Sequence, residues 1–256
     1  MKPLYLHSPP ALHVALDGPA LRVQAESTAP RLFPLRRVSR VVVSGDVAWD
    51  SQALLACADQ GITVSFLEAD GAPRARLIGK SGKRNELRQR LADFLDRPDW
   101  SELYAQWTQA MQRREARLCA WRLRLDLETP NRLIGAVVRA RLLRYVEPRE
   151  IKRIQRWLRG LLYARAGAAL RDLGLGAELE LFAGLPNDLS SMLMWSLYPE
   201  LLIWTMRRSA RARCRGNAFV PEPRMIVTFC EGQAAALDSR LMGLLNRLHH
   251  WLVEPN

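Results

Sequence analysis

The chain has 256 residues, 48% of them hydrophobic, which is enough for one large domain or two modest ones with a sizeable core. Lysine and arginine number 38 against 26 acidic residues, and the net charge of +12 favours a polyanionic partner, either nucleic acid or an anionic membrane surface. The four cysteines lie far apart without a CxxC pair, which argues against a zinc ribbon or a disulfide scaffold.

The N-terminal sequence MKPLYLHSPP contains no apolar run of the kind that signal peptides need. The protein is therefore expected in the cytoplasm, where thiols stay reduced. Most of the cations are arginines, which suit bidentate contacts with phosphate. A GC-rich genome would explain part of the arginine-to-lysine ratio, but it would not explain the surplus of base over acid.

Residues 1–80 are predicted to form a small β-rich domain. Asp17-Gly18-Pro19 separates two short apolar runs and predicts a β-hairpin. A short helix is expected at 51–59, where Ser51 can cap the first turn and Gln60-Gly61 ends the last one. The expected strands cover residues 4–6, 13–16, 20–24, 32–35, 39–44, 62–67 and 74–78.

Residues 81–84, in a stretch rich in glycine and lysine, are interpreted as a linker, and residues 85–256 as a larger all-α domain. Apolar residues recur at helical spacing throughout this second part. The predicted fold class is therefore α+β, with a β-rich N-terminal domain followed by an all-α C-terminal domain. The expected helices cover residues 85–95, 99–125, 131–145, 149–173 and 238–252.

The stretch 189–206 (LSSMLMWSLYPELLIWTM) is nearly free of charge, with Glu200 its one ionisable residue. A membrane span needs about 20 clean apolar residues, and Pro199, Glu200 and three serines interrupt this run. We therefore interpret it as the buried central helix of the helical domain, kinked or restarted near Pro199. A cluster of arginines follows immediately.

Between residues 33 and 71 a series of short motifs follows in a fixed order. These motifs are Phe33-Pro34-Leu35, Arg37-Val38, Arg40–Val43, Gly45-Asp46-Val47, Ser51-Gln52-Ala53-Leu54, Gly61-Ile62, Val64, Phe66-Leu67 and Gly71. Their order resembles the N-terminal domain of the CRISPR-associated spacer integrase family, the Cas-one family. The resemblance implies a β domain followed by a helical domain, which agrees with the pattern above, and dimerisation through the β domain.

In that family the helical domain holds Mg²⁺ or Mn²⁺ with a Glu, a His and an Asp, and the ion assists the attack of a DNA 3′-hydroxyl on a phosphodiester. This sequence keeps the frame of those motifs, at Gly174-Leu175 and Tyr198-Pro199, without the ligands. The Glu position falls on residues 165–168 (RAGA), the His position on 182–184 (FAG) and the Asp position on Trp195. The resemblance therefore implies no catalytic residue, no metal ligand and no cofactor here.

Other carboxylates near these positions are Glu178, Glu180, Asp188 and Glu200. Glu178 and Glu180 form the alternative, in which displaced acids hold Mg²⁺ or Mn²⁺. The simpler interpretation is a solvated loop, because a tryptophan at a ligand position fills the cavity with an aromatic ring.

The excess of positive charge lies in three segments of the helical part and predicts salt-dependent contacts with DNA phosphates. The alternative is a solvated surface balanced by acids elsewhere in the chain. The predicted DNA-binding residues are Arg139, Arg141, Arg144, Lys152, Arg153, Arg156, Arg207, Arg208, Arg211, Arg213 and Arg215.

These observations favour a DNA-binding, catalytically inactive homologue of the spacer integrase. Such a protein would be a homodimer that positions DNA in a CRISPR-linked complex, with a Cas-two-like or other CRISPR-associated protein as partner and no membrane association. One alternative is an active metal-dependent endonuclease or integrase that uses the displaced carboxylates. The other is an adaptor that binds proteins and has no nucleic-acid role.

Overall fold

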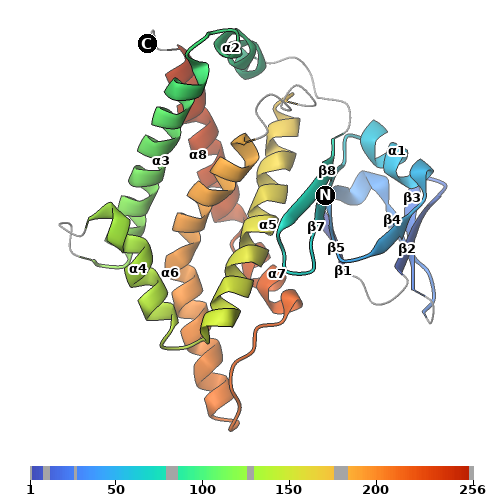
Figure 1. Ribbon diagram of the computed structural model, residues 1–256. Helices are drawn as coiled ribbons and strands as arrows, with labels where there is room; N and C mark the ends of the chain where they lie inside the picture. Colours follow the sequence, from blue (N-terminus) through green and yellow to red (C-terminus); the bar gives the residue numbers. More distant parts are fainter. Residues whose placement is uncertain are drawn as a thin grey trace. The chain divides into compact units, whose positions relative to one another are not determined.

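The computed structural model describes residues 2–7, 12–25, 28–78, 86–125, 130–175 and 184–253 (Figure 1). The chain divides into two compact units, each made of two chain segments. The first comprises residues 1–92 and 163–186, and the second comprises residues 93–162 and 187–256. A β-rich N-terminal region followed by helices confirms the predicted α+β class. The proposed linker at 81–84 lies outside the described residues, so the predicted domain boundaries stay a prediction.

Two four-stranded sheets form the β part of the first unit. In one sheet the first three strands run parallel and the fourth is antiparallel, in the order β1 (Lys2–His7), β5 (Val38–Ser44), β7 (Thr63–Leu67) and β8 (Pro73–Leu77). In the other, three strands are antiparallel and the last pairs in parallel, in the order β4 (Arg31–Pro34), β3 (Ala20–Gln24), β2 (Leu12–Asp17) and β6 (Val47–Trp49).

Alternate residues of both sheets form one hydrophobic core with helix α1 (Ser51–Asp59). Val14 and Leu21 come from one sheet and Val41 from the other, and all three are fully buried. Helix α1 adds Cys57, whose thiol pKa burial raises to about 11, so this cysteine behaves as a small apolar side chain. The predicted hairpin between β2 and β3 is confirmed.

Strand β6 was not predicted, because three residues are too few to show a periodic pattern. Backbone pairing with β2 defines this strand, and β2 lies more than thirty residues earlier in the sequence. Trp49 is the last residue of β6 and contacts Phe66 edge-on, with 6.4 Å between the ring centroids.

Every helix predicted from apolar spacing is present, with some changes at the ends. The fourth helix stops at Leu142, three residues early, and the C-terminal helix starts at Ala234, four residues early. The helices that follow the β part are α2 (Glu86–Leu95), α3 (Trp100–Arg122), α4 (Asn131–Leu142), α5 (Pro148–Asp172), α6 (Leu185–Arg213), α7 (Pro223–Gly232) and α8 (Ala234–Val253).

Aromatic and charged contacts hold α3 and the end of α2 against α8 in the second unit. Trp251 lies 5.9 Å from Trp107 and 5.0 Å from Phe94, measured between ring centroids. Further along, the carboxylate of Glu115 is 1% exposed and accepts a hydrogen bond from Arg240 Nε at 2.9 Å. This buried acid has its charge paired, as buried acids require.

Helix α6 does not restart near Pro199, which was one of the two possibilities expected there, and the expected kink stays a prediction. It runs without interruption from Leu185 to Arg213, so the arginine cluster belongs to the same helix as the buried stretch. Asp188, interpreted from the sequence as a loop residue, lies in its first turn. Across the described helices, none is both long enough and apolar enough to span a membrane.

Candidate nucleic-acid interface

The predicted DNA-binding arginines of α4 lie at its C-terminal end and in the turn after it. Arg139 and Arg144 are exposed, and Arg144 sits in the turn that follows the helix. Arg141 is half-buried and donates a hydrogen bond from Nη1 to the Leu123 carbonyl at 3.1 Å. This contact links the start of the loop after α3 to α4, so Arg141 has a structural role as well as a charge.

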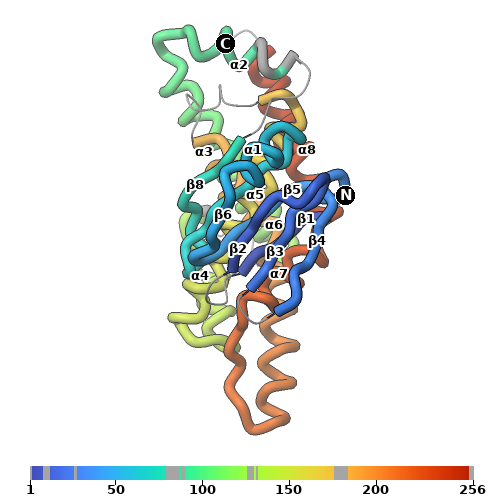
Figure 2. The backbone as a smooth tube through the Cα atoms, turned by 90° about the vertical axis from the view of Figure 1, so that its right-hand side faces the viewer, coloured from blue at the N-terminus to red at the C-terminus, as the bar shows by residue number. Residues whose placement is uncertain are grey.

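The arginines of α6 occupy its last turns and the residues after it. Arg207, Arg211, Arg213 and Arg215 are exposed, and Arg208 is half-buried. Within the described parts of the chain, none of the five forms an ion pair. The end of α6 and the segment that returns from it extend beyond the other helices of their unit in both views (Figures 1 and 2). These cations are therefore available to a polyanion.

The third segment, on α5, is less uniform. Lys152 and Arg156 are exposed, and Arg156 has a further interaction within the chain. Arg153 is half-buried, pairs with Glu150 at 3.3 Å and donates a hydrogen bond to the Pro221 carbonyl. Arg153 therefore anchors the segment that returns from α6, and little of its charge remains for a ligand.

Two cavities show which of the predicted arginines lie together. Arg144 and Arg213 line one of about 250 Å³, along with Arg149. Arg141 and Arg144 line another of about 400 Å³, along with Arg122 and Arg124. Lys152, Arg153 and Arg156 line neither cavity.

Arg122 and Arg124 were missed by the sequence reasoning. They lie in the WRLRL run at the end of α3, which by pattern alone is an ordinary basic helix end. The φ angle of Arg124 is +51°, the left-handed region that favours glycine. No sequence signal marks that conformation at an arginine.

Trp195 occupies the position that the resemblance assigns to the metal-binding Asp. Its indole Nε1 donates a hydrogen bond to Gln112 Oε1 at 2.9 Å, and its ring contacts Tyr198 at 5.5 Å. A Cβ built on Gly135 of α4 would lie 3.6 Å from the Trp195 ring. An amide, a phenol and a glycine offer no carboxylate or imidazole, so these surroundings do not fit Mg²⁺ or Mn²⁺.

The remaining acids near that segment are already engaged. Asp188 accepts a hydrogen bond from Tyr104 Oη at 2.7 Å, and burial raises the pKa of this carboxyl. Glu200 accepts a hydrogen bond from Arg122 Nη2 at 2.7 Å. Among the described residues, no group of three histidine, cysteine or acidic side chains is arranged to hold a metal ion.

The other positions of the expected metal site can be described only in part. Arg165, Ala166 and Ala168 are buried on α5. Glu178, Glu180, Phe182 and Ala183 lie outside the described residues, as does most of the loop that contains them.

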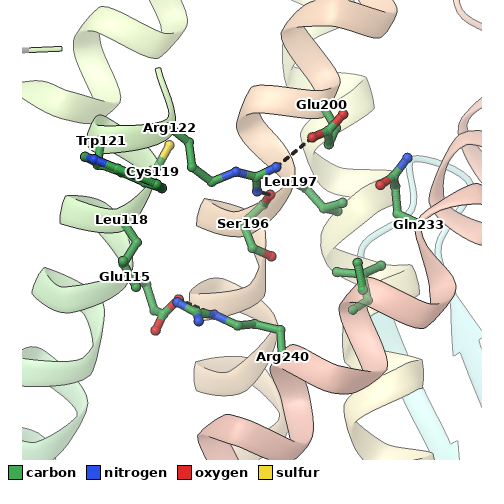
Figure 3. A pocket seen from close by; sticks show the side chains of 12 residues that line it. Glu115, Leu118, Cys119, Trp121, Arg122, Ser196, Leu197, Glu200, Gln233 and Arg240 are labelled. Atoms are coloured by element: carbon green, nitrogen blue, oxygen red, sulfur yellow. Dashed lines mark hydrogen bonds and ion pairs between the residues drawn. The ribbon is translucent and has the colours of Figure 1, made fainter. Parts of the chain in front are cut away.

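A polar cavity of about 310 Å³ lies between α3, α6 and α8 (Figure 3). Arg122 and Glu200 point toward one another across it, as do Glu115 and Arg240. Cys119 also lines it, and burial raises the pKa of its thiol to about 12, so the thiol stays protonated. Because these charges are paired within the protein, this cavity has less to offer a charged ligand than the arginine-lined ones.

Comparison with known proteins gives a family match in the first half of the chain. The family model described as CRISPR associated protein Cas1 matches residues 4–132, slightly more than half of the 256 residues. Among curated proteins no significant match is found.

Solved structures with the same fold cover almost the whole chain. A CAS1 protein from Thermotoga maritima superposes with a TM-score of 0.75 at 11% identity, covering 100% of this chain and 98% of that one. TtCas1 in its complex with DNA gives 0.53 at 17% identity, with 98% and 90% covered. A chain of a Cas6-RT-Cas1–Cas2 complex gives 0.65 at 12% identity, covering 97% of this chain and 35% of that one. At these identities the likeness shows a shared fold.

Proposed function

Because the chain belongs to the family of the CRISPR associated protein Cas1, we propose that it is a DNA-binding, catalytically inactive member that positions DNA in a CRISPR adaptation complex. The loss of catalysis is proposed because of the side chain at position 195 and its surroundings. A position at which the family resemblance expects a metal-binding carboxylate holds an indole bonded to Gln112. Filling the site with a ring removes the cost of clustered like charges that no ion neutralises.

The DNA-binding half of the proposal rests on the cations of α4 and α6. A surface with several arginines and no paired acid neutralises phosphates and releases counterions, largely without regard to sequence. The net charge of +12 favours the same partner. One solved structure with this fold is a complex with DNA, which is consistent with such a role.

We infer the partners from the same family. Dimerisation would use the N-terminal β part, where Leu32 on strand β4 is 58% exposed. A Cas2-like protein is the expected second partner, since one structure with this fold is part of an assembly that contains Cas2. Sedimentation analysis of the protein and of Leu32→Asp tests the dimer, because a charge in an apolar interface should dissociate it.

The function is tested by two measurements on one preparation. Binding to duplex and branched DNA is followed as salt rises, and strand transfer is assayed with Mg²⁺ and with Mn²⁺. We expect binding that weakens steeply with salt and no strand-transfer product. Weak binding that is insensitive to salt would contradict the DNA role, and metal-dependent product would contradict the loss of catalysis.

The two alternatives predict different results in the same assays. An enzyme with displaced ligands would give metal-dependent product that Glu178→Gln and Glu180→Gln abolish. An adaptor without a nucleic-acid role would purify with a protein partner, with a low 260/280 nm absorbance ratio and no DNA shift.

A further inference from the structure

The cavity between the ends of α3 and α4 and the middle of α6 is here called the arginine pocket. Four arginines line it, together with a set of apolar α6 residues, here called the apolar floor: Pro199, Leu202, Ile203 and Met206. Arg122, Arg124, Arg141 and Arg144 contribute guanidinium groups. No acidic side chain lines it; its other lining residues are Leu123, Tyr145, Pro199, Leu202, Ile203 and Met206. Its volume of about 400 Å³ lies within the range of small-ligand sites.

The four guanidinium groups differ in how far the protein occupies them. Arg122 is bonded to Glu200 and to the Ser196 carbonyl, and Arg141 to the Leu123 carbonyl. Within the described residues, Arg124 and Arg144 form no ion pair and are exposed to solvent. Two fixed and two available cations around one hollow suit a doubly charged anion, which guanidinium groups bind in a bidentate manner.

The floor indicates that the ligand is more than a bare anion. Ile203 and Met206 are 41% and 42% exposed, although they belong to a helix that is otherwise buried along this stretch. Exposed apolar side chains that line the same cavity as four arginines favour a ligand that has both a negatively charged group and a flat apolar ring. Tyr145 adds an aromatic ring at the edge of the same cavity, and aromatic rings stack on nucleobases.

The backbone at Arg124 supports a role for this side chain. Its left-handed conformation ends α3, with the Leu125 amide bonded to the Ala120 carbonyl at 3.0 Å. Glycine is the usual residue at such a helix end, and a larger residue there is strained. The side chain of this strained arginine lines a cavity that has no acidic lining residue. The strain is therefore best explained by a ligand that needs the positive charge of Arg124.

From these observations we infer that the arginine pocket binds a nucleoside phosphate, either a free mononucleotide or the phosphorylated terminal nucleotide of a strand. The inference rests on the proposed DNA role and extends it by naming a second contact, which shares Arg141 and Arg144 with the proposed DNA-binding surface. Arg124 and Arg144 bind the phosphate, and the apolar floor with Tyr145 contacts the base.

The test uses titration calorimetry with thymidine 5′-monophosphate and thymidine, with a short single strand that carries either a 5′-phosphate or a 5′-hydroxyl, and with inorganic phosphate. We expect the phosphorylated form of one probe to bind about tenfold tighter than its unphosphorylated form, since charge-assisted contacts are lost with the phosphate. A preference for the free nucleotide identifies a soluble ligand, and a preference for the phosphorylated strand identifies a strand end. Inorganic phosphate that binds as tightly as either would contradict a role for the apolar floor.

The matched variants are Arg124→Gly, which keeps the left-handed turn, and Arg113→Gln, an exposed change elsewhere on α3. Arg124→Gly should abolish the preference for phosphate while duplex affinity near 0.1 M salt falls by no more than about tenfold, because at most one phosphate contact is lost. Arg113→Gln should change neither.

If duplex DNA binds and no probe shows a phosphate preference, the pocket is overturned and the DNA role stands. If phosphorylated probes bind and duplex does not, the DNA-positioning role fails and the pocket stands.

Discussion

At the scale of single residues, Arg124 combines a backbone cost with an exposed charge. A side chain with φ of +51° is strained, whereas glycine adopts this conformation freely. We expect Arg124→Gly to raise the free energy of unfolding by about 0.5–1 kcal/mol. Arg113→Gly, in the interior of the same helix, should lower it by about 1 kcal/mol. Urea unfolding of both variants measures the difference, and destabilisation by both would contradict strain at Arg124.

Asp188 provides a pH-dependent prediction. Burial raises the pKa of this carboxyl, and the hydrogen bond from Tyr104 partly offsets the rise. The pKa of Asp188 in the folded protein lies above its pKa in the unfolded chain, which is about 3.9. The carboxyl therefore makes its full contribution to stability at pH values below the unfolded pKa. The contribution is lost as pH rises through the folded pKa.

The measurement is the unfolding free energy of the natural protein minus that of Asp188→Asn, from pH 3 to pH 7, a range set by the carboxyl value in solution of about 3.9. This difference should fall with rising pH by no more than about 1.4 kcal/mol per pH unit, the limit for one proton. Tyr104→Phe should move the fall to higher pH, since it removes the bond that stabilises the charged carboxylate. A difference that rises with pH would show that the folded pKa is lowered instead.

At the scale of elements, much of the fold could be predicted, because strands and helices buried on one face carry their own periodicity. The hairpin at Gly18 and the end of helix α1 at Gln60-Gly61 came from local turn signals. The cap expected at Ser51 was wrong, since Ser51 is the first helical residue and the N-cap Asp50 forms no side-chain cap hydrogen bond. Strand β6 could not be predicted from local signals, because it depends on pairing with β2, which is distant in the sequence. The continuity of α6 could not be predicted either, because local sequence alone favours a break at a proline. Of the four arginines that line the arginine pocket, Arg141 and Arg144 were predicted from the sequence, whereas Arg122 and Arg124 were not, because only the packing of α3 against α4 and α6 brings them to this cavity.

We expect Arg122 to help stabilise the unbroken course of α6 through Pro199. Proline removes one helix hydrogen bond and crowds the carbonyl four residues earlier, here that of Trp195, at a cost of about 3 kcal/mol. Arg122 of α3 reaches across this turn, donating to the Ser196 carbonyl at 3.0 Å and to Glu200 at 2.7 Å. It therefore supplies bonds from outside the helix on both sides of the proline.

A double-mutant cycle tests this compensation. Arg122→Ala should destabilise the protein by about 1–2 kcal/mol while Pro199 is present. In a Pro199→Ala background, the cost of Arg122→Ala should be smaller by at least about 0.5 kcal/mol, because the regular helix no longer needs the outside donor. Equal costs in both backgrounds would mean that Arg122 stabilises the unit through Glu200 alone.

At the scale of the whole molecule, a net charge of +12 does not say which cations bind DNA. The structure separates them by their partners. Arg207 and Arg211 extend from α6 without an ion pair among the described residues, whereas Arg153 is committed to Glu150 and the Pro221 carbonyl. Equal formal charges should therefore contribute unequally to binding, in a way that composition cannot reveal.

The salt dependence of duplex binding distinguishes these roles. Each phosphate contact contributes about 0.9 to the slope of log K against log salt concentration. Arg207→Ala and Arg211→Ala should each lower that slope by about one and leave the melting temperature nearly unchanged. Arg153→Ala should leave the slope unchanged and lower the melting temperature, since it removes the bond to the Pro221 carbonyl and leaves the buried Glu150 with the more distant Arg149, at 3.7 Å, as its cationic partner. Arg153→Ala could instead lower the slope as much as the α6 variants do. DNA binding would then depend on the net charge of the protein and not on a particular surface, and the DNA-positioning role would lose its structural basis.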